Sequence, residues 1–537
     1  MSGRNWLFFG LIALVMFGLG FLSSSVTASP SASVSGVVVD EQGSPVAGAT
    51  VRIQATSNST LSGLNGAFTL NNLTEGITVT VSAWKETYYC AKVEGVMPPA
   101  SGITLTLRFY QTNDNPDYEW IPPTGVNSCY SCKPGVTDIW LNNDLHAKSG
   151  TNPRFFSLYN GSDITGTEVI TPGYKLDFPG TAGNCANCHA PGAAIDAPFA
   201  TDMNLLTGVD RDFGVHCDFC HKVADVYLNP STGLPYPNAP GVVSMDVRRP
   251  FPDSSRYQLF FGTFDDDNVP LEDTNLPLIR RSQWCAACHQ FSFWGTPIYQ
   301  SFNEWLESPY PQYGVECQTC HMLPDGVMTN VAPGMGGVER DPLTIHAHTM
   351  PGAANETLLQ NTVDMTVTAQ AIGGTVTVSV TLTNTGAGHH VPTDHPGRHM
   401  ILTVAASDGD GQALHQVGGD IVPEWGGAQA DLPGKTFAKV LKDALSGEYP
   451  VVSYWKQTFI VSDNRIPAMD SDTSTYLFAV SQTGGEITLT VQLLFRRNFQ
   501  AEMDARGWNS PDILMKQIQT NIIAAPYWRV FLPGISR

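Results

Sequence analysis

The sequence predicts three regions in a row: a β-sandwich, a region of short helices with little regular secondary structure, and a second β-sandwich. Two observations lead to this prediction. Apolar and polar residues alternate with a period of two in residues 33–110 and again in residues 359–537, which is typical of strands with one buried face. Between these stretches the alternation fades, glycine and proline are scattered, and all but one of the 11 cysteines occur. So many turn residues do not support long helices.

The composition of the 537-residue chain excludes several classes of protein. Hydrophobic residues make up 42% of the chain, enough to build cores, so the chain is not disordered throughout. Asp and Glu outnumber Lys and Arg by 49 to 29, and the resulting net charge of −20 argues against nucleic acid as a partner. With 11 cysteines, the chain is too poor in cysteine for a disulfide scaffold.

Residues 1–28 are predicted to be a secretory signal peptide. Arg4 gives a positive start, residues 6–22 form an uninterrupted apolar run, and Ala28 ends a small-residue cleavage site. The alternative is an uncleaved membrane anchor, because such a run is at the short limit of about 17 residues for spanning a bilayer. No later run is that long, so we expect no transmembrane segment after signal removal. The mature chain is expected to be secreted, on the cell surface or in the periplasm.

Residues 29–111 are expected to form the first β-sandwich, with turn signals at residues 41–45 and 64–66. Its most distinctive segments are Gly36-Val37-Val38-Val39-Asp40, Gly43-Ser44-Pro45-Val46-Ala47-Gly48-Ala49-Thr50-Val51 and Asn65-Gly66-Ala67-Phe68. These segments closely resemble the carboxypeptidase regulatory-like family. The resemblance implies a small antiparallel sandwich that serves as a spacer or adhesion module and carries no catalytic residues. A polar, proline-containing linker follows at residues 112–123.

The middle region, residues 112–358, contains four copies of the pattern Cys-x-x-Cys-His, the attachment signature of c-type haem. Two thiols three positions apart form thioethers with one porphyrin, and the adjacent imidazole becomes the proximal iron ligand. Paired Cys-x-x-Cys units also bind zinc, but zinc does not require an adjacent histidine each time. We therefore predict four haem c groups packed in this region. The motif residues are Cys185, Cys188 and His189; Cys217, Cys220 and His221; Cys285, Cys288 and His289; and Cys317, Cys320 and His321.

The four motifs form an internal repeat. Cys185 and Cys285 are 100 positions apart, and so are Cys217 and Cys317. Each repeat therefore holds two motifs, and we interpret it as a two-haem unit used twice. Short separation brings paired haems close together, which suits rapid electron exchange, and the haems supply much of the core of this region.

A fifth motif has lysine where histidine is expected. Its residues are Cys129, Cys132 and Lys133. A deprotonated amine can ligate haem iron if it is buried, so the favoured interpretation is a fifth, Lys133-ligated haem. The alternative is a thiol pair or disulfide that holds no haem.

Histidines outside the motifs are candidates for the distal haem ligands. Four bis-histidine haems need four further histidines, and the best candidates are His146, His346, His348 and one of His389 and His390. His216 lies directly beside Cys217, which constrains it too strongly for this role.

The segments around these histidines resemble extracytoplasmic multihaem c-type cytochromes. The superfamily in question contains the tetrahaem cytochromes of hydroxylamine oxidation and the pentahaem nitrite reductases, and the resemblance covers roughly residues 124–415. It implies that residues 140–147, 346–352 and 384–393 supply distal ligands, with His389 preferred over His390. The Lys133 motif resembles the catalytic haem of the nitrite reductases. Two departures from that group are that this motif comes first in the chain and that the C-terminal third is predicted to be strands where those enzymes have long helices.

Residues 359–537 are expected to form the second sandwich and to contribute a distal haem ligand. Residues 363–371 and 375–383 are predicted to form one hairpin, and residues 476–480 and 487–495 another. Residues 512–523 are predicted to form a short helix. In the middle region, the acidic residues 265–268 and 272–273 have carboxylates suited to Ca²⁺, although a solvated acidic loop is the favoured interpretation.

The favoured function is electron transfer by an exported multihaem cytochrome. Its partners would be redox proteins or an extracellular electron acceptor, and the chain would function alone or as a homopolymeric filament. In this interpretation the protein is not an enzyme. The alternative is a reductase of nitrite or a related small nitrogen or sulfur oxide, with its active site at a haem ligated by Lys133.

Overall fold

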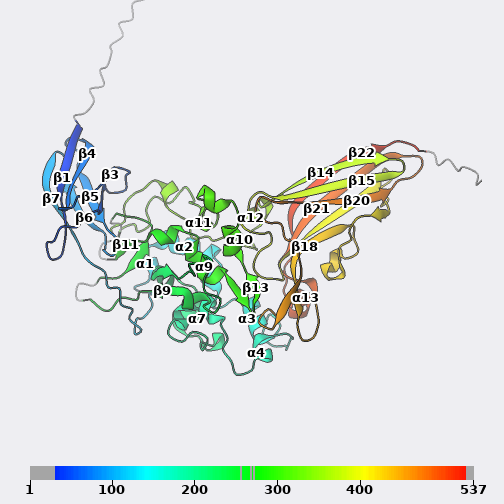
Figure 1. The fold of residues 1–537 in the computed structure, drawn as a ribbon, viewed down its shortest axis with the longest axis horizontal. Coiled ribbons are helices and arrows are strands. Elements are labelled where there is room, and N and C mark those ends of the chain that lie inside the picture. The colour runs from blue at the N-terminus through cyan, green and yellow to red at the C-terminus, as the bar shows by residue number, and fades with distance from the viewer. Residues whose placement is uncertain (1–30, 254–256, 267–268, 270–271, 528–537) are drawn as a thin grey trace, which may run out of the picture.

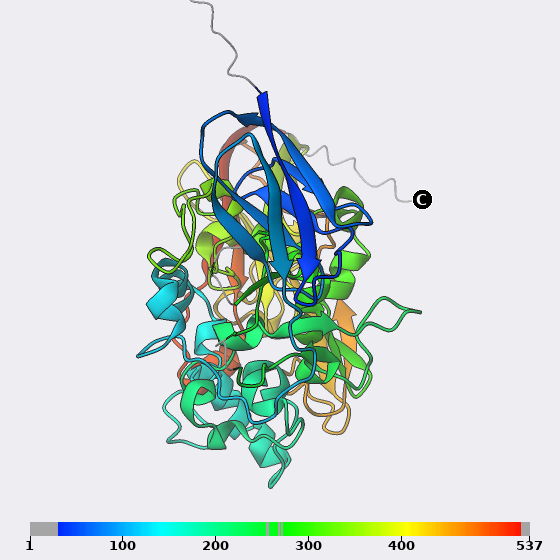
Figure 2. The same ribbon diagram turned by 90° about the vertical axis from the view of Figure 1, so that its left-hand side faces the viewer.

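The computed structural model describes residues 31–253, 257–266, 269 and 272–527, and the predicted fold class is confirmed (Figure 1). Sheets occupy both ends of the chain, and short helices and loops form the middle. The molecule is elongated, with the N-terminal sheets at one end and the C-terminal sheets at the other; Figure 2 views it from the N-terminal end. The predicted signal peptide, residues 1–28, lies outside the described residues. In the described part, no helix has the length and apolar character needed to cross a membrane.

The N-terminal region contains two sheets that enclose a core with Val38, Val51 and Leu105. The first sheet has the order β4-β1-β7 and consists of β1 (Ser31–Asp40), β4 (Ala67–Thr74) and β7 (Ala100–Leu107). The second has the order β3-β2-β5-β6 and consists of β2 (Thr50–Ile53), β3 (Ser59–Leu61), β5 (Val79–Trp84) and β6 (Ala91–Val96). The family resemblance implies a wholly antiparallel sandwich, and this expectation is wrong for one pair of strands. The first and last strands, β1 and β7, run in the same direction and pair in parallel.

The turn before β4 depends on a glycine. Gly66 has a φ of +75°, and a Cβ there would lie 2.4 Å from the Val38 carbonyl oxygen. The Val38 N–H donates to the Gly66 carbonyl at 2.8 Å, which holds the turn against β1. Glycine is therefore required both for the left-handed backbone and for the close approach.

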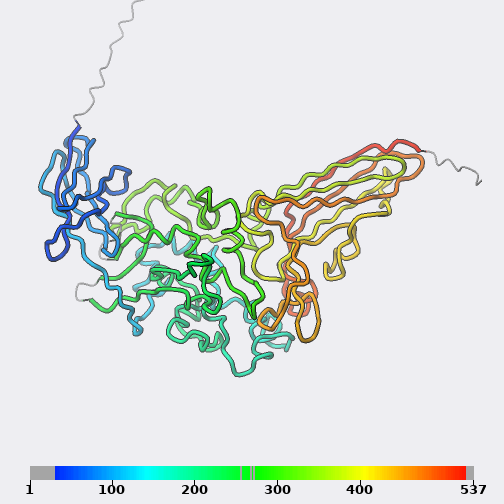
Figure 3. The backbone as a smooth tube through the Cα atoms, viewed as in Figure 1, coloured from blue at the N-terminus to red at the C-terminus, as the bar shows by residue number. Residues whose placement is uncertain are grey.

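The middle region is built from short helices joined by loops (Figure 3). Its helices are α1 (Cys129–Cys132), α2 (Pro134–Asn143), α3 (Pro153–Asn160), α4 (Tyr174–Asp177), α5 (Ala186–His189), α6 (Pro191–Ala194), α7 (Gly208–Asp212), α8 (Cys217–Cys220), α9 (Gln283–His289), α10 (Ser301–Leu306), α11 (Cys317–His321) and α12 (Glu356–Gln360). Its two-stranded pairs are β8 (Val223–Val226) with β9 (Met245–Val247), β10 (Phe260–Gly262) with β11 (Asp273–Asn275), and β12 (Phe291–Phe293) with β13 (Thr296–Tyr299). The buried cluster of this region includes Ala186, Phe219 and Ala286, so it gathers around the cysteine motifs.

The C-terminal region is a second two-sheet structure with its own apolar core. One sheet has the order β14-β15-β20-β17 and consists of β14 (Val363–Ile372), β15 (Thr375–Asn384), β17 (Gln416–Gly418) and β20 (Ser471–Ala479). The other has the order β19-β18-β16-β21-β22 and consists of β16 (His399–Asp408), β18 (Gly434–Asp443), β19 (Thr458–Asp463), β21 (Gly485–Arg496) and β22 (Ile513–Ala524). One helix, α13 (Gln500–Arg506), connects β21 to β22.

Two of the secondary-structure predictions for this region are wrong. β14 and β15 form the first predicted hairpin, but β20 and β21 do not pair with each other. β20 pairs with β15 and β21 pairs with β16, because the chain crosses from one sheet to the other between them. The predicted helix at residues 512–523 is instead β22, which pairs with β21 along its length. Cross-strand pairing overrides the weak helical pattern, since apolar and polar residues also alternate here.

Buried polar contacts join the C-terminal region to the middle region. Arg465 Nη1 lies 2.7 Å from Glu304 Oε1, and both side chains are almost fully buried. Lys439 Nζ donates to the carbonyl oxygens of Pro297 and Ile298 at 3.0 and 3.1 Å. These contacts hold β18 and the segment after β19 against β13 and α10 of the middle region.

Candidate haem-binding sites

All five cysteine motifs fold in the same local way. In each motif the segment between its two cysteines is part of a short helix: α1, α5, α8, α9 or α11. Residues three apart on a helix lie on the same face, so each pair of thiols can reach one group. The motif with Lys133 has this geometry too.

The motifs converge in space. The thiols of Cys129 and Cys217 lie close enough to affect each other's pKa, and so do those of Cys188 and Cys288 and those of Cys285 and Cys317. Only the last contact falls within a predicted two-motif repeat unit. The contact of Cys188 with Cys288 joins the two units, and that of Cys129 with Cys217 joins the Lys133 motif to the first unit. The motif of Cys285 and Cys288 thus contacts two neighbours. This motif is therefore the junction of the cluster.

Three motif histidines face a second histidine from elsewhere in the chain. The ring centroids of His221 and His348 are 6.2 Å apart. Those of His146 and His289 are 6.3 Å apart, and those of His321 and His389 are 6.4 Å apart. Metal–imidazole bonds are about 2 Å long, so two imidazoles on opposite sides of one metal have centroids about 6 Å apart. The spacing of these three pairs fits an iron held between two rings.

Backbone carbonyls fix the orientation of three of these rings. His221 Nδ1 donates to the Phe261 carbonyl at 2.6 Å, and His321 Nδ1 to the Pro351 carbonyl at 2.8 Å. His389 Nδ1 donates to the His390 carbonyl at 2.9 Å. A carbonyl only accepts, so the proton is on Nδ1 and the Nε2 lone pair is left for a metal.

In the remaining pair, His146 and His289, the Nδ1 atoms face carboxylates instead of backbone carbonyls. His146 Nδ1 lies 2.9 Å from Asp144 Oδ1, and His289 Nδ1 lies 3.4 Å from Asp394 Oδ2. Asp144 comes from the loop after α2, whereas Asp394 comes from the C-terminal region. The C-terminal loop between β15 and β16 thus brings both His389 and Asp394 to the cysteine motifs.

Burial keeps most motif histidines neutral. Loss of water lowers the pKa of His189 to about 4, that of His221 to about 3 and that of His321 to about 4. A neutral imidazole has the free lone pair that coordination requires. His289 differs: burial lowers its pKa, but the hydrogen bond and charge of Asp394 outweigh burial and raise the pKa to about 9.

The other predicted ligands have different surroundings. The His189 ring stacks on Phe155, with centroids 4.2 Å apart. His346 Nδ1 donates to the Met322 carbonyl at 2.9 Å, and His390 Nδ1 lies 3.7 Å from Glu304 Oε1. Among the residues that the structure describes, none of these three rings is in contact with a second imidazole ring. His216 Nδ1 accepts the Phe219 N–H at 3.2 Å, so it caps α8.

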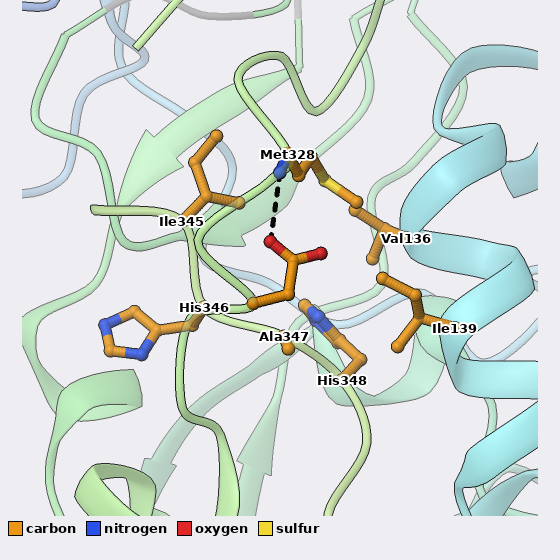
Figure 4. A pocket seen from close by; sticks show the side chains of 8 residues that line it. Val136, Ile139, Met328, Ile345, His346, Ala347 and His348 are labelled. Atoms are coloured by element: carbon orange, nitrogen blue, oxygen red, sulfur yellow. Dashed lines mark hydrogen bonds between the residues drawn. The ribbon is translucent and has the colours of Figure 1, made fainter. Parts of the chain in front are cut away.

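His346 and His348 line a small pocket against α2 (Figure 4). Val136 and Ile139 of α2 form its opposite wall, and the two rings point in different directions. This pocket places His348 toward His221 while His346 turns toward Met322.

Lys133 is partly buried and has an ion-pair partner. Its Nζ donates to Glu272 Oε1 at 2.6 Å. Burial lowers the pKa of Lys133, but the charges of Glu272 and Asp273 outweigh it, and the net pKa is raised. In this arrangement Lys133 is an ammonium without a lone pair.

The acidic residues considered for Ca²⁺ have cationic partners instead. Asp265 pairs with Arg52 at 2.6 Å, and Asp266 pairs with Arg340 at 2.8 Å. Among the described residues no cluster of three or more acidic, histidine or cysteine side chains is arranged to hold a metal ion. These carboxylates therefore do not fit a Ca²⁺ site; residues 267 and 268 lie outside the described part.

The family model for the carboxypeptidase regulatory-like domain matches residues 33–109. This segment is a carboxypeptidase regulatory-like domain. No curated protein matches the chain.

Solved structures show what the rest of the fold is similar to. A penta-haem cytochrome c552 from Thermochromatium tepidum matches with a TM-score of 0.53 and 21% identity, over 75% of this chain and 100% of that chain. An interface mutant of a type II cohesin–X-dockerin complex from Acetivibrio cellulolyticus matches with a TM-score of 0.13 and 24% identity, over 15% of this chain and 57% of that chain. The chain thus has a multihaem cytochrome-like fold beyond its carboxypeptidase regulatory-like domain.

Sequence reasoning missed the two carboxylates that contact histidine rings. Asp144 is two positions before His146, and this spacing allows its side chain to accept both the backbone N–H and the ring Nδ1 of that histidine. The two-residue spacing of Asp144 and His146 could therefore have been recognised in the sequence. Asp394 is 105 positions from His289, and nothing in the sequence links the two.

Proposed function

We propose that this chain is an exported multihaem c-type cytochrome that carries electrons along closely packed haems to an extracytoplasmic partner or acceptor. The observation that carries the proposal is the set of three histidine pairs at the spacing of two axial ligands. The multihaem cytochrome-like fold and the Cys-x-x-Cys-His motifs support the same conclusion. When bound, each haem supplies an iron that takes up and releases one electron.

Each pair assigns a set of residues to one haem. Cys217 and Cys220 attach the first, with His221 and His348 as its axial ligands. Cys285 and Cys288 attach the second, with His289 and His146. Cys317 and Cys320 attach the third, with His321 and His389. A fourth haem, on Cys185 and Cys188, has His189 as its proximal ligand, and His346 and His390 are the candidates for its distal ligand.

The contacts among the motifs favour electron transfer between sites. Thiols of neighbouring motifs lie close enough to affect each other's pKa, so the groups they attach would lie close together. The N-terminal domain would act as a spacer or docking module, and the partner would be a redox protein, an extracellular acceptor or further copies of this chain in a filament.

A fifth haem at Cys129 and Cys132 is part of the proposal. It is supported by the helical turn of α1, by the contact of Cys129 with Cys217 and by the fold likeness to a penta-haem cytochrome. The ion pair of Lys133 with Glu272 argues against Lys133 as its ligand in this arrangement. The reductase alternative requires Lys133 to leave Glu272 and lose its proton.

The test is the intact mass and visible spectrum of the exported protein after denaturation. Thioether-bound haem survives denaturation, so we expect a mass increase of one haem per motif together with low-spin haem bands in the native protein. A colourless protein without added mass would overturn the proposal. Reduction of nitrite at a cyanide-binding haem would favour the reductase instead.

A further inference from the structure

The three histidine pairs differ in what their Nδ1 atoms contact. His221, His321 and His389 donate to backbone carbonyls, which are neutral. His146 and His289, which face each other, both contact carboxylates. The proposed haem between them is therefore the one with a negative charge behind each axial ligand.

Asp144 is held tightly behind His146. Its Oδ1 accepts the backbone N–H of His146 at 2.9 Å and lies 2.9 Å from the ring Nδ1. The residue is 1% exposed, and its Oδ2 is buried without a hydrogen-bond partner in the described structure. No Lys or Arg neutralises it among the ion pairs of the described residues.

Asp394 is held behind His289 by the backbone, with a longer contact of 3.4 Å to the ring. Its Oδ1 accepts the backbone N–H groups of Gln300 and Ser301 at 3.1 and 3.2 Å, at the start of α10. Its Oδ2 faces His289 Nδ1, and the residue is 7% exposed. The backbone anchors on one oxygen leave the other aimed at the imidazole.

We infer that Asp144 and Asp394 are positioning residues that give the His146/His289 haem the lowest reduction potential of the three bis-histidine sites. This inference rests on the proposed function. A carboxylate that accepts the Nδ1 proton makes the imidazole a stronger donor to the metal, and strong donation stabilises the oxidised state. Reduction adds one electron to the iron, breaks no bond and leaves the Nδ1 proton on the imidazole. Buried negative charge opposes that added electron further, because screening is weak away from water.

The site proposed to have the lowest reduction potential lies between two neighbouring motifs. Its cysteines contact both Cys188 and Cys317, so it is the junction between neighbouring sites. An electron is held least strongly at a site of low potential. Asp144 and Asp394 thereby make the junction a place that passes electrons on to its neighbours.

The angle between the two imidazole planes distinguishes this site from the other two by EPR. The planes of His146 and His289 are 82° apart, whereas those of His321 and His389 are 18° apart and those of His221 and His348 are 32° apart. Nearly perpendicular axial imidazoles give an oxidised low-spin haem a large-g EPR signal, and nearly parallel rings give a rhombic signal. EPR therefore separates the junction haem from the other two.

The test is a dithionite titration of the full-length haem-loaded protein followed by EPR, first on the unmodified protein. We expect a large-g signal to disappear at a more negative potential than the rhombic signals do.

The Asp144→Asn and Asp394→Asn variants keep a hydrogen-bond acceptor but remove the charge. Each should shift the midpoint of the large-g signal to more positive potential, and the double variant should shift it further. The rhombic signals should shift less, because Asp144 also acts on His348 and Asp394 also acts on His321. Asp472→Asn removes the same charge from β20, where Asp472 pairs with Lys435 and not with a histidine, and should shift none.

The outcomes distinguish this inference from the proposed function. A large-g signal that titrates above the rhombic signals overturns the inference, even if neither variant folds. Equal shifts in Asp144→Asn, Asp394→Asn and Asp472→Asn overturn it as well. A protein without low-spin haem would contradict the proposed function itself.

Discussion

The imidazole ring of His389, in the loop after β15, lies nearly parallel to that of His321, 6.4 Å away at the end of α11. His389 thus comes from the C-terminal sandwich and His321 from the region of the cysteine motifs. The proposed haem between them would tie the two regions together. The C-terminal sandwich is therefore part of the proposed electron path and not only an attached module.

Replacing His389 should free one coordination position. We expect His389→Ala to convert one haem from low-spin to high-spin and to allow cyanide binding at that haem, as measured by visible absorption and EPR. His415→Ala is the control, since His415 is an exposed histidine of the same C-terminal region next to β17, and it should leave every haem low-spin. The assignment is wrong if His389→Ala leaves every haem low-spin.

Removing the fifth thiol pair should remove one haem. The Cys129→Ser/Cys132→Ser variant has no thiols to form thioethers on α1, so its intact mass should be lower than that of the unmodified protein by one haem. Cys90→Ser serves as the control and should keep the full number of haems, because Cys90 is in the N-terminal domain. An unchanged haem count in the variant without Cys129 and Cys132 would mean that this motif carries none.

The buried ion pair between the C-terminal and middle regions should contribute strongly to stability. Arg465→Met leaves the Glu304 carboxylate buried without its 2.7 Å partner, and we expect the free energy of unfolding to fall by about 3–5 kcal/mol. Chemical denaturation measures the change. The more exposed pair of Lys435 and Asp472 is the control, because Lys435→Met should cost at most about 1 kcal/mol. Equal losses in the two variants would contradict this account.

Much of the fold follows from local sequence, and much of the site does not. The β14–β15 hairpin is predictable because its two strands adjoin a Gly373-Gly374 turn. The separation of β20 from β21 depends on which distant strand each one pairs with, which no local pattern records. The helical turns of the cysteine motifs are local as well. The pairing of His221 with His348 joins segments far apart in the chain, and only the fold brings their rings together.

The carboxylate of Asp443 should make stability depend on pH in the acid range. Burial raises the pKa of Asp443, but Lys456 and the N–H groups of Ser446 and Leu445 outweigh burial and lower the pKa to about 2. A carboxyl with a lowered pKa stabilises the folded state above its unfolded pKa of about 3.9 and loses that effect as the pH falls toward 2. At pH 7, Asp443→Asn should reduce the free energy of unfolding by about 2 kcal/mol. The difference from the unmodified protein should shrink between pH 4 and pH 2, and a constant difference over that range would refute the explanation.

The Lys133–Glu272 ion pair decides whether the fifth haem has an amine ligand. Because Lys133 Nζ donates to Glu272 at 2.6 Å and carries a proton, we expect Lys133→Met to leave unchanged the number of haems that bind cyanide. Cyanide titration monitored by visible absorption counts these haems.

Glu272→Gln is the companion variant. It removes the carboxylate that holds the ammonium, which lowers the pKa of Lys133 and makes the amine available. In Glu272→Gln, the affinity of one of the haems for cyanide should therefore be lower than in the unmodified protein. If Lys133→Met instead adds a cyanide-binding haem, then Lys133 leaves Glu272 in the loaded protein and ligates iron, as the reductase alternative requires.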